Sequence, residues 1–379
     1  MNNKKYINKV IVGISGGVDS AVSAWLLKKQ NYQVEGLFMK NWEEDDENKQ
    51  CNSYQDLNDA KSICKSIGIK LHKINFSSEY WDYVFKNFIY EYKKGRTPNP
   101  DILCNKKIKF KFFLDFAIKE LKADYIATGH YVIKKKINKE TFLCKGFDYT
   151  KDQSYFLHCL NQNQLSKSLF PLGRFKKKYV REIAKNIGLS VANKKDSTGI
   201  CFIGPKNINI FLKKYISSES GNIVNTNNKI IGKHSGLIHY TIGQRKGLKI
   251  GGIKNNLINK PWYVIKKDIL KNILVVDQGN YSKNLMSIGL IANQLNWINK
   301  DTLTFPIHCN AKTRYRQYDV FCKVHKISRF YIKVIFNKPV CAVTPGQYVV
   351  FYIKNICLGG GVIDKNIPVI KDDTSNLID

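Results

Sequence analysis

The chain has 379 residues, enough for two or three domains, and its 43% of hydrophobic and 24% of charged residues exclude a wholly disordered protein. No apolar run reaches the roughly 18 residues that a membrane-spanning helix needs. Lys and Arg number 62 against 30 Asp and Glu, and the resulting net charge of +32 favours a polyanionic partner such as nucleic acid. Drifting base composition would also enrich Lys, Asn and Ile, so charge alone leaves this open.

The first part of the chain alternates predicted strands and helices. Short β-branched or alternating runs predict strands at 9–14, 33–39, 69–74 and 123–128. Apolar residues at helical spacing predict helices around 22–26, at 57–67 and at 180–187. The basic N-terminal stretch leads directly into the first strand, which favours a strand over a signal peptide. This alternation predicts an α/β fold, a parallel sheet with helices on both faces.

The pattern changes near residue 215, where polar and turn residues precede a series of short alternating runs. These runs lie at 262–267, 272–278, 303–309, 330–336 and 348–354. They indicate β-hairpins and a small antiparallel barrel. We therefore predict three domains: an α/β catalytic domain at 1–214, a central β-rich domain at 215–284 and a C-terminal β-barrel at 285–379.

None of the ten cysteines forms a C-x-x-C pair, so the sequence contains neither a zinc ribbon nor a thioredoxin-type motif. A chain of this length without a recognisable secretory signal is typical of a reducing cytoplasm. Most of the thiols are therefore expected to be small buried hydrophobic groups.

The segment SGGVDS, Ser15–Ser20, follows the first predicted strand and opens the first helix. Gly16 and Gly17 allow the backbone to approach an anion, and the helix N-terminus supplies free N–H groups. Asp19 is an acid within this anion site, so we expect it to hold Mg²⁺ against phosphates. The alternative is an ordinary glycine turn with Ser20 as N-cap. SGGVDS resembles the loop of the N-type ATP pyrophosphatases, which cleave ATP to AMP and pyrophosphate.

Two cysteines lie in segments rich in lysine. Pro98 and Pro100 predict an extended loop that leads to Cys104, and Lys106, Lys107 and Lys109 follow it. Cys201 lies in the glycine-containing segment 196–204, after Lys194 and Lys195. Nearby positive charge favours a reactive thiolate. Either cysteine taken alone is more typical of a structural thiol, but the two could meet across a cleft.

Further segments occur in a fixed order after SGGVDS. They are GLFMKNW (36–42), GRTPNPDILCNKKIKF (95–110), TGHY (128–131), KDQSYFL (151–157), DSTGICFIG (196–204), TIGQRKGL (241–248) and KTRYRQ (312–317). From about Lys9 to Gly361 the chain resembles the bacterial tRNA-specific 2-thiouridylases. Members of this family replace the C2 oxygen of the wobble uridine in certain tRNAs with sulfur.

The resemblance implies the site residues. It places an ATP site at Gly13, Ile14, Ser15, Gly16, Gly17, Val18, Asp19, Ser20, Met39 and Gly129. It places contacts to the target base at Asn99, Pro100 and Asp101, and contacts to tRNA at His130, Lys151, Asp152, Gln153, Arg314, Tyr315 and Gln347. Cys104 matches the family's nucleophile and Cys201 its persulfide carrier. The implied cofactors are ATP and Mg²⁺, and the implied partners are tRNAs for Lys, Glu and Gln and a persulfide sulfur-donor protein, with no membrane.

The chemistry accounts for this set of residues. Adenylation turns the C2 oxygen into a leaving group, AMP. Sulfur then arrives by one of two routes: Cys104 attacks the persulfide on Cys201 and releases sulfide, or the persulfide attacks C2 and Cys104 resolves the adduct. Both routes leave a Cys104–Cys201 disulfide. Asp101 is either a general acid or base or a loop acid that caps a backbone N–H.

The interleaved basic and aromatic residues of 312–318 fit phosphate contact with base stacking, or equally a solvated barrel strand. Two other functions compete with thiolation. An amidating synthetase of the same superfamily needs an ammonia source, and the sequence has no glutaminase motif. A non-catalytic RNA-binding protein has no need of intact Asp19, Cys104 and Cys201.

Overall fold

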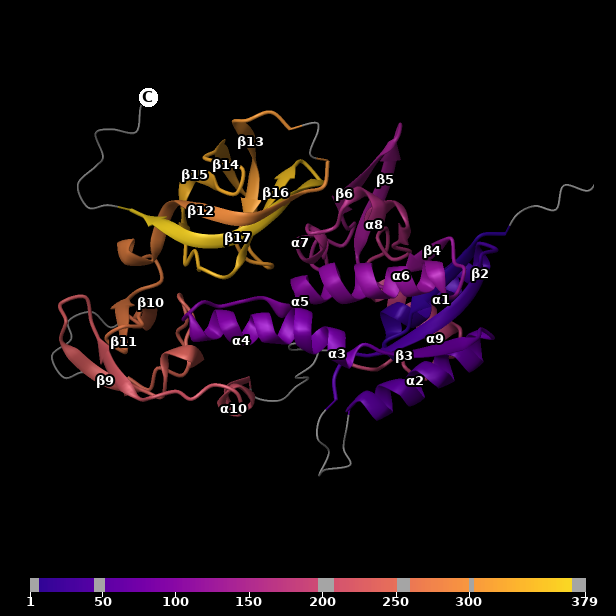
Figure 1. Cartoon of the computed structure of the whole chain (residues 1–379), viewed down its shortest axis with the longest axis horizontal. Helices are drawn as coiled ribbons and strands as arrows, with labels where there is room; N and C mark the ends of the chain where they lie inside the picture. The colour runs from indigo at the N-terminus through magenta and orange to yellow at the C-terminus, as the bar shows by residue number, and fades with distance from the viewer. Residues whose placement is uncertain (1–6, 44–51, 197–207, 251–259, 300–302, 370–379) are drawn as a thin grey trace, which may run out of the picture.

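The computed structural model describes residues 7–43, 52–196, 208–250, 260–299 and 303–369. It contains three sheets: a parallel sheet near the N-terminus, a small central sheet, and a barrel formed mainly by the C-terminal strands (Figure 1). Among the described residues, none of the helices combines the length and the apolar character needed to cross a membrane.

The N-terminal sheet is parallel throughout and has the strand order β3-β2-β1-β4-β7. Its strands are β1 Lys9–Gly13, β2 Gln33–Lys40, β3 Leu71–Asn75, β4 Tyr125–Ala127 and β7 Ser168–Leu169. Both faces are covered, since Val10 and Val12 pack into one apolar cluster and Ile11 packs into another. The predicted α/β fold is therefore confirmed.

Helices pack on the two faces of this sheet. The Val10 face is covered by α1 Val18–Lys29, α2 Asn52–Ile67 and α9 Lys177–Asn186. The Ile11 face is covered by a run that begins with α3 Ser77–Tyr80, the π-helix η1 Trp81–Phe85 and α4 Lys86–Lys93. That run continues through α5 Pro100–Leu103, the π-helix η2 Cys104–Phe112 and α6 Phe113–Lys119. Gly68, the residue that follows α2, has a positive φ of 69°, a conformation typical of the glycine that ends a helix.

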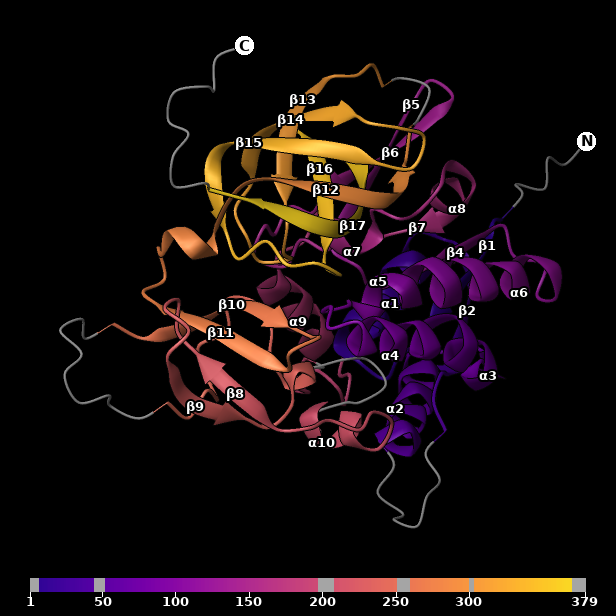
Figure 2. The ribbon, with the colours of Figure 1, turned by 60° about the vertical axis from the view of Figure 1, so that its left-hand side comes forward.

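The central sheet has the order β10-β11-β8-β9 and a small core of its own, which includes Ile223, Val264 and Leu274. Its strands are β8 Gly221–Val224, β9 Ile230–His234, β10 Trp262–Asp268 and β11 Ile273–Gln278. The helical segments α10 Ile208–Lys213, η3 Leu237–His239 and η4 Lys283–Leu285 lie around it in sequence. In Figure 2 this sheet lies below the barrel and beside the N-terminal domain.

Six antiparallel strands close the barrel in the order β12-β15-β14-β13-β16-β17, with β17 pairing back to β12. They are β12 Met286–Trp297, β13 Ile307–Lys312, β14 Val320–Lys326, β15 Ile332–Cys341, β16 Tyr348–Ile353 and β17 Ile356–Pro368. The antiparallel barrel expected from the sequence is thus present. The run predicted at 303–309 forms a strand only from Ile307 onward.

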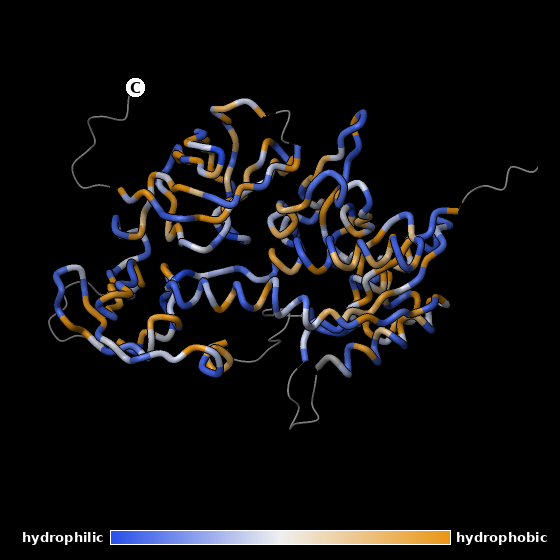
Figure 3. The backbone as a smooth tube through the Cα atoms, viewed as in Figure 1, coloured by the Kyte–Doolittle hydropathy of each residue, from blue (hydrophilic) through white to orange (hydrophobic). Residues whose placement is uncertain are grey.

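A hairpin of the N-terminal part joins this barrel sheet. The hairpin consists of β5 Val132–Ile137 and β6 Glu140–Lys145, and β6 pairs with β17 through Cys144 and Ile356. The tip of the hairpin is hydrophilic (Figure 3). The short helices α7 Ser154–Leu157 and α8 Gln162–Ser166 follow the hairpin in the chain. The barrel and the N-terminal domain therefore share one continuous sheet, which the sequence did not predict.

Candidate nucleotide and RNA site

The SGGVDS segment forms the turn between β1 and α1. Since β1 lies between β2 and β4, this turn sits where the strand order reverses, at the carboxyl edge at which α/β sheets bind ligands. Gly17 is the N-cap, with extended backbone and no side-chain cap. The alternative in which Ser20 caps the helix is wrong, because Ser20 lies inside the first turn and its hydroxyl donates to the Gly17 carbonyl oxygen at 3.0 Å. The first N–H groups of α1 are therefore left for an anion.

Two glycines, Gly16 and Gly129, allow the backbone to pack tightly around this loop. Gly16 has a φ of 72°, and a Cβ there would lie 2.5 Å from the Asp56 carbonyl oxygen. A Cβ on Gly129, in the loop after β4, would lie 2.9 Å from backbone and Cβ carbons of Asp19. A Cβ on Gly13 would lie 3.4 Å from Met39. The structure therefore brings the predicted ATP residues Gly13, Met39 and Gly129 around the SGGVDS loop.

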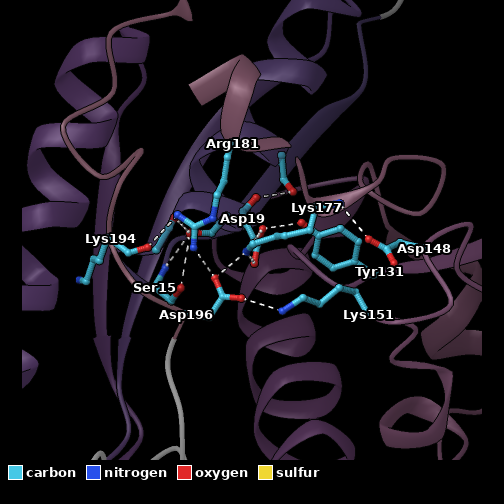
Figure 4. A network of polar contacts seen from close by, with 12 residues as sticks. Ser15, Asp19, Tyr131, Asp148, Lys151, Lys177, Arg181, Lys194 and Asp196 are labelled. Carbon is cyan, nitrogen blue, oxygen red and sulfur yellow. Dashed lines mark hydrogen bonds and ion pairs between the residues drawn. The ribbon is translucent and has the colours of Figure 1, made fainter. Parts of the chain in front are cut away.

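Asp19 is held by two side chains from other elements (Figure 4). The Lys177 ammonium lies 2.7 and 2.8 Å from its two carboxylate oxygens, and the Tyr131 hydroxyl donates to it at 2.7 Å. Burial and the neighbouring Asp19 charge raise the pKa of Tyr131, so this phenol stays protonated and acts as a donor. Neither Lys177 nor Tyr131 was predicted from the sequence as a site residue.

Asp19 is the acidic residue of the SGGVDS loop and the one expected to hold Mg²⁺. Within the described ranges, no group of three or more His, Cys, Asp or Glu side chains is arranged to hold a metal. Asp19 offers a single carboxylate, which suits an ion bound mainly by nucleotide phosphates and water rather than by a cage of protein ligands.

A second carboxylate, Asp196, lies close to Asp19 and is surrounded by cations (Figure 4). Lys177 and Arg181 each lie 2.8 Å from it, and Lys151 lies 2.9 Å from it. Burial raises the pKa of Asp196, but hydrogen bonds from Lys177 and Lys151 outweigh this and lower the pKa to about 2. Lys177 and Arg181 were missed from the sequence, although their spacing of four residues on one helix face was a usable signal.

Lys194 links the stretch before Asp196 to the SGGVDS loop. Its ammonium donates to the Gly16 carbonyl oxygen at 3.0 Å and to the carboxylates of Asp56 and Asp59 at 2.7 and 2.6 Å. Burial lowers the pKa of Lys194, but the hydrogen bonds to the two carboxylates raise it overall. Lys194 therefore stabilises the loop, whereas the sequence suggested a role beside a thiol.

Cys104 does not lie in the extended loop that the sequence predicted. The Asn99 side chain accepts a hydrogen bond from the Asp101 N–H at 3.2 Å, and Pro100 begins α5, with Cys104 directly after it in η2. Asn is a favourable N-cap and Pro is favourable at the first helical position, so the pair starts a helix here. The Cys104 residue is only 1% exposed. Another reactant can reach this thiol only if neighbouring residues move.

Cys201 lies outside the described residues, with most of the segment 196–204, so its pairing with Cys104 remains a prediction. The target-base residues Asn99, Pro100 and Asp101 form the start of α5. Pro100 is buried there, and Asn99 uses its side-chain oxygen as a cap.

The predicted tRNA residues after β4 contribute mostly to local structure. His130 is buried and its Nδ1 lies 2.7 Å from the Thr128 hydroxyl; burial lowers its pKa well below the usual value, so the ring is neutral. Asp152 accepts hydrogen bonds from the Gly146 and Ser154 N–H groups, and Gln153 accepts one from the Tyr131 N–H. Lys151 is more exposed than His130 and Asp152, and its ammonium lies 2.9 Å from the Asp196 carboxylate.

The predicted tRNA residues of the barrel lie where it meets the N-terminal domain. Gln347 donates from its amide to the Thr97 carbonyl oxygen at 2.7 Å, and the Tyr315 ring lies 4.4 Å from that of Phe156. Arg314 donates from Nη2 to the Ile242 and Ala342 carbonyl oxygens and to the Thr344 hydroxyl, at 2.7, 3.2 and 2.9 Å. We call the set Thr97, Ile242, Arg314, Thr344 and Gln347 the barrel junction. The contact between Gln347 and Thr97 places the barrel junction beside residues 99–101, which are predicted to contact the target base.

Comparison with known proteins covers nearly the whole chain. Three family domains match in order: "tRNA methyl transferase HUP domain" at 8–205, "tRNA methyl transferase PRC-barrel domain" at 209–278 and "Aminomethyltransferase beta-barrel domain" at 287–363. The chain is 64% identical over 362 residues to the tRNA-specific 2-thiouridylase MnmA of Buchnera aphidicola subsp. Acyrthosiphon pisum (strain APS), covering 96% of this chain and 98% of that protein.

Two further relatives carry the same name. The protein of Buchnera aphidicola subsp. Baizongia pistaciae (strain Bp) is 56% identical over 369 residues, covering 97% of this chain and 100% of that protein. The protein of Shigella flexneri serotype 5b (strain 8401) is 55% identical over 361 residues, covering 95% of this chain and 98% of that protein. Together with the motifs and the loop geometry, these matches show that the chain belongs to the tRNA-specific 2-thiouridylase family.

Proposed function

We propose that the protein uses ATP to replace the C2 oxygen of the wobble uridine of tRNA with sulfur, giving 2-thiouridine, AMP and pyrophosphate. The observation that carries this proposal is the SGGVDS loop at the reversal of strand order, with the Gly129 backbone packed against Asp19. That arrangement suits a polyphosphate, and family membership supplies the RNA substrate.

In the first step the loop binds ATP and orients it toward the uridine. The N–H groups at the start of α1 face the phosphates, and the ordinary role of Mg²⁺, with Asp19 as its protein ligand, is to neutralise phosphate charge. In the free protein the Asp19 carboxylate forms an ion pair with Lys177. The C2 oxygen attacks the α-phosphorus, and pyrophosphate leaves.

In the second step sulfur displaces AMP from C2. The Cys104 thiolate attacks the inner sulfur of a Cys201 persulfide, so an S–S bond forms between the two cysteines, sulfide leaves, and sulfide attacks C2. In the alternative route the outer sulfur of the persulfide attacks C2, and Cys104 then breaks the S–S bond of the adduct. Either route ends with a Cys104–Cys201 disulfide that a dithiol reductant must reduce.

The remaining roles belong to the same proposal. Asn99, Pro100 and Asp101 contact the splayed base, with Asp101 as general acid or base, and His130, Lys151, Asp152, Gln153, Arg314, Tyr315 and Gln347 form the tRNA surface. A persulfide protein supplies sulfur in the cytoplasm, and tRNAs for Lys, Glu and Gln are the acceptors. The three domains are taken as 1–214, 215–284 and 285–379.

The test is mass spectrometry of nucleosides from tRNA incubated with the protein, ATP, Mg²⁺ and a persulfide donor. We expect 2-thiouridine at the wobble position, and pyrophosphate release that depends on tRNA. Cys104→Ser and Cys201→Ser are each expected to abolish thiolation. The matched control is Cys64→Ser, because Cys64 is buried in the helix layer and burial raises its pKa to about 11. Full thiolation by Cys201→Ser would rule out the persulfide relay.

A further inference from the structure

Asp196 forms ion pairs with cationic side chains from two parts of the N-terminal domain. Lys151 comes from the loop before α7, whereas Lys177 and Arg181 lie one turn apart on α9. Arg181 also donates to the Ala192 and Lys194 carbonyl oxygens at 2.9 and 3.0 Å, which fixes the backbone next to Asp196. The Lys151 side chain is 40% exposed, so it is the cation most able to leave for another anion.

Lys177 is shared between two carboxylates (Figure 4). Its side chain is only 11% exposed, and its ammonium lies within 2.8 Å of both Asp19 and Asp196. The Lys177 backbone N–H donates to Asp148 at 2.9 Å, which holds the start of α9 in place. Two acids therefore compete for one poorly hydrated cation, and Coulomb attraction is stronger at such a site than in bulk water.

We propose that Asp196 and Lys177 are positioning residues that couple RNA contact at Lys151 to nucleotide binding at Asp19. The inference rests on the proposed function, in which Lys151 meets tRNA and Asp19 faces the metal–nucleotide complex. When an RNA phosphate attracts Lys151, Asp196 loses one cation and pulls Lys177 more strongly. The ion pair between Lys177 and Asp19 is then weaker, so the Asp19 carboxylate binds the Mg²⁺ of the nucleotide more tightly.

The coupling has a definite sign and is reciprocal. RNA bound at Lys151 strengthens binding of the magnesium nucleotide, and the nucleotide strengthens RNA binding by the same factor. We expect a factor of about five, toward the lower end of measured allosteric couplings, because Lys151 is partly exposed.

The experiment measures equilibrium binding, so it does not depend on turnover. The probe is an ATP analogue with a methylene bridge between the α and β phosphorus atoms, with Mg²⁺, titrated calorimetrically with and without saturating tRNA transcript that carries a wobble uridine. Wild-type protein is expected to bind the analogue about fivefold more tightly with tRNA. Asp196→Asn, which keeps the shape of the side chain but removes its charge, is expected to bring that ratio to about one.

Lys151→Gln gives a second test that leaves the Lys177 and Asp196 side chains in place. Without Lys151, Asp196 already holds Lys177 as it does with RNA bound, so free Lys151→Gln protein is expected to bind the analogue about fivefold more tightly than free wild type, and tRNA adds no further gain. Asp82→Asn is the matched control, since among the described residues the ion-pair partner of Asp82 is the exposed Lys86, at 2.7 Å. It is expected to preserve the wild-type ratio.

The outcomes separate this inference from the proposed function. A wild-type ratio of one, with both ligands bound and thiolation intact, would overturn the coupling and leave the proposed function standing. A fivefold ratio that persists in Lys151→Gln would also overturn it. Failure of the wild-type protein to bind either ligand would overturn both the proposed function and the coupling.

Discussion

The SGGVDS loop and the barrel junction are both rich in polar groups, but the hydrogen bonds that these groups form differ between the two regions. At the SGGVDS loop, glycines bring backbones together, and α1 begins at an N-cap that forms no side-chain hydrogen bond with the first turn. At the barrel junction, one nitrogen of Arg314 already donates to three protein acceptors, and Gln347 donates to Thr97. The first region leaves donors for a ligand, whereas the second uses them to hold domains together.

This difference shows what a motif alone does not reveal. The segment 312–317 has the basic and aromatic composition of an RNA-binding strand. In the structure, however, Arg314 reaches the central domain through Ile242, and Tyr315 packs on Phe156. Contacts of this kind hold the barrel against the other two domains, whether or not the side chain touches RNA.

The largest expected effect comes from breaking the backbone contact at the nucleotide loop with Gly129→Ala. Its Cβ would lie 2.9 Å from Asp19 backbone and Cβ carbons, so the loop must shift. Because a displacement of about 1 Å at a reaction centre costs on the order of 100-fold, we expect tRNA-dependent pyrophosphate release to fall by at least that factor.

The matched control for Gly129→Ala is Gly232→Ala in β9. A Cβ at Gly232 has no neighbour closer than 3.7 Å among the described residues. We expect pyrophosphate release within about twofold of wild type for this variant, since Ala fits the site without a shift. Unchanged release in Gly129→Ala would show that the loop after β4 is not part of the ATP site.

Sequence patterns predicted the elements whose signals are local. Strand β1, the loop that follows it and helix α1 could be located because hydrophobic runs, glycines and a helix start lie next to each other in the chain. The pairing of β6 with β17 could not be predicted, because its partners Cys144 and Ile356 lie far apart in the sequence, one in the N-terminal domain and the other in the barrel. The contact of Lys177 with Asp19 was missed for the same reason, since the two residues are 158 positions apart in the sequence.

Cys104 shows a different limit of sequence reasoning. Two prolines suggested a loop, but the residue before the second proline is Asn99, and that combination also begins a helix. The resemblance located the cysteine, whereas its burial depended on packing by α7 and the aromatic core, which no local pattern specifies.

The barrel junction is tested by Arg314→Ala. Removal of the guanidinium leaves the Ile242 and Ala342 carbonyl oxygens and the Thr344 hydroxyl without this donor, so we expect the free energy of unfolding to fall by about 1–3 kcal/mol. tRNA affinity is expected to fall with it. The measurement is chemical denaturation, together with tRNA affinity at several salt concentrations.

The salt dependence separates architecture from direct contact. If Arg314 also contacts a phosphate, the slope of log affinity against log salt falls by about one unit in Arg314→Ala. Arg316→Ala is the matched comparison, because Arg316 is an exposed residue of the same segment. Unchanged stability in Arg314→Ala would show that the hydrogen bonds of Arg314 do not stabilise the fold.

The smallest effect concerns acid stability where the barrel packs on α7. His158 is buried, its ring lies 5.2 Å from that of Tyr348, and its Nδ1 lies 2.8 Å from the Tyr155 carbonyl oxygen. Burial lowers the pKa of His158 to about 4, against an ordinary value of 6.5. The unfolded chain therefore binds a proton at His158 below pH 6.5, whereas the folded chain binds it only below about pH 4. Stability is lost as the pH falls from 6.5 to about 4.

At pH 5 this difference amounts to about 2 kcal/mol relative to pH 7, since each pKa unit corresponds to about 1.4 kcal/mol. We expect His158→Asn to be less stable than wild type at pH 7 but to lose about 2 kcal/mol less on going to pH 5. The measurement is denaturant unfolding of both proteins at the two pH values. The stability difference between the two proteins is compared at pH 7 and at pH 5. Its change isolates the contribution of His158, because the other buried histidines, including His130, are present in both proteins. Parallel pH profiles would mean that His158 is not the group that makes this packing sensitive to acid.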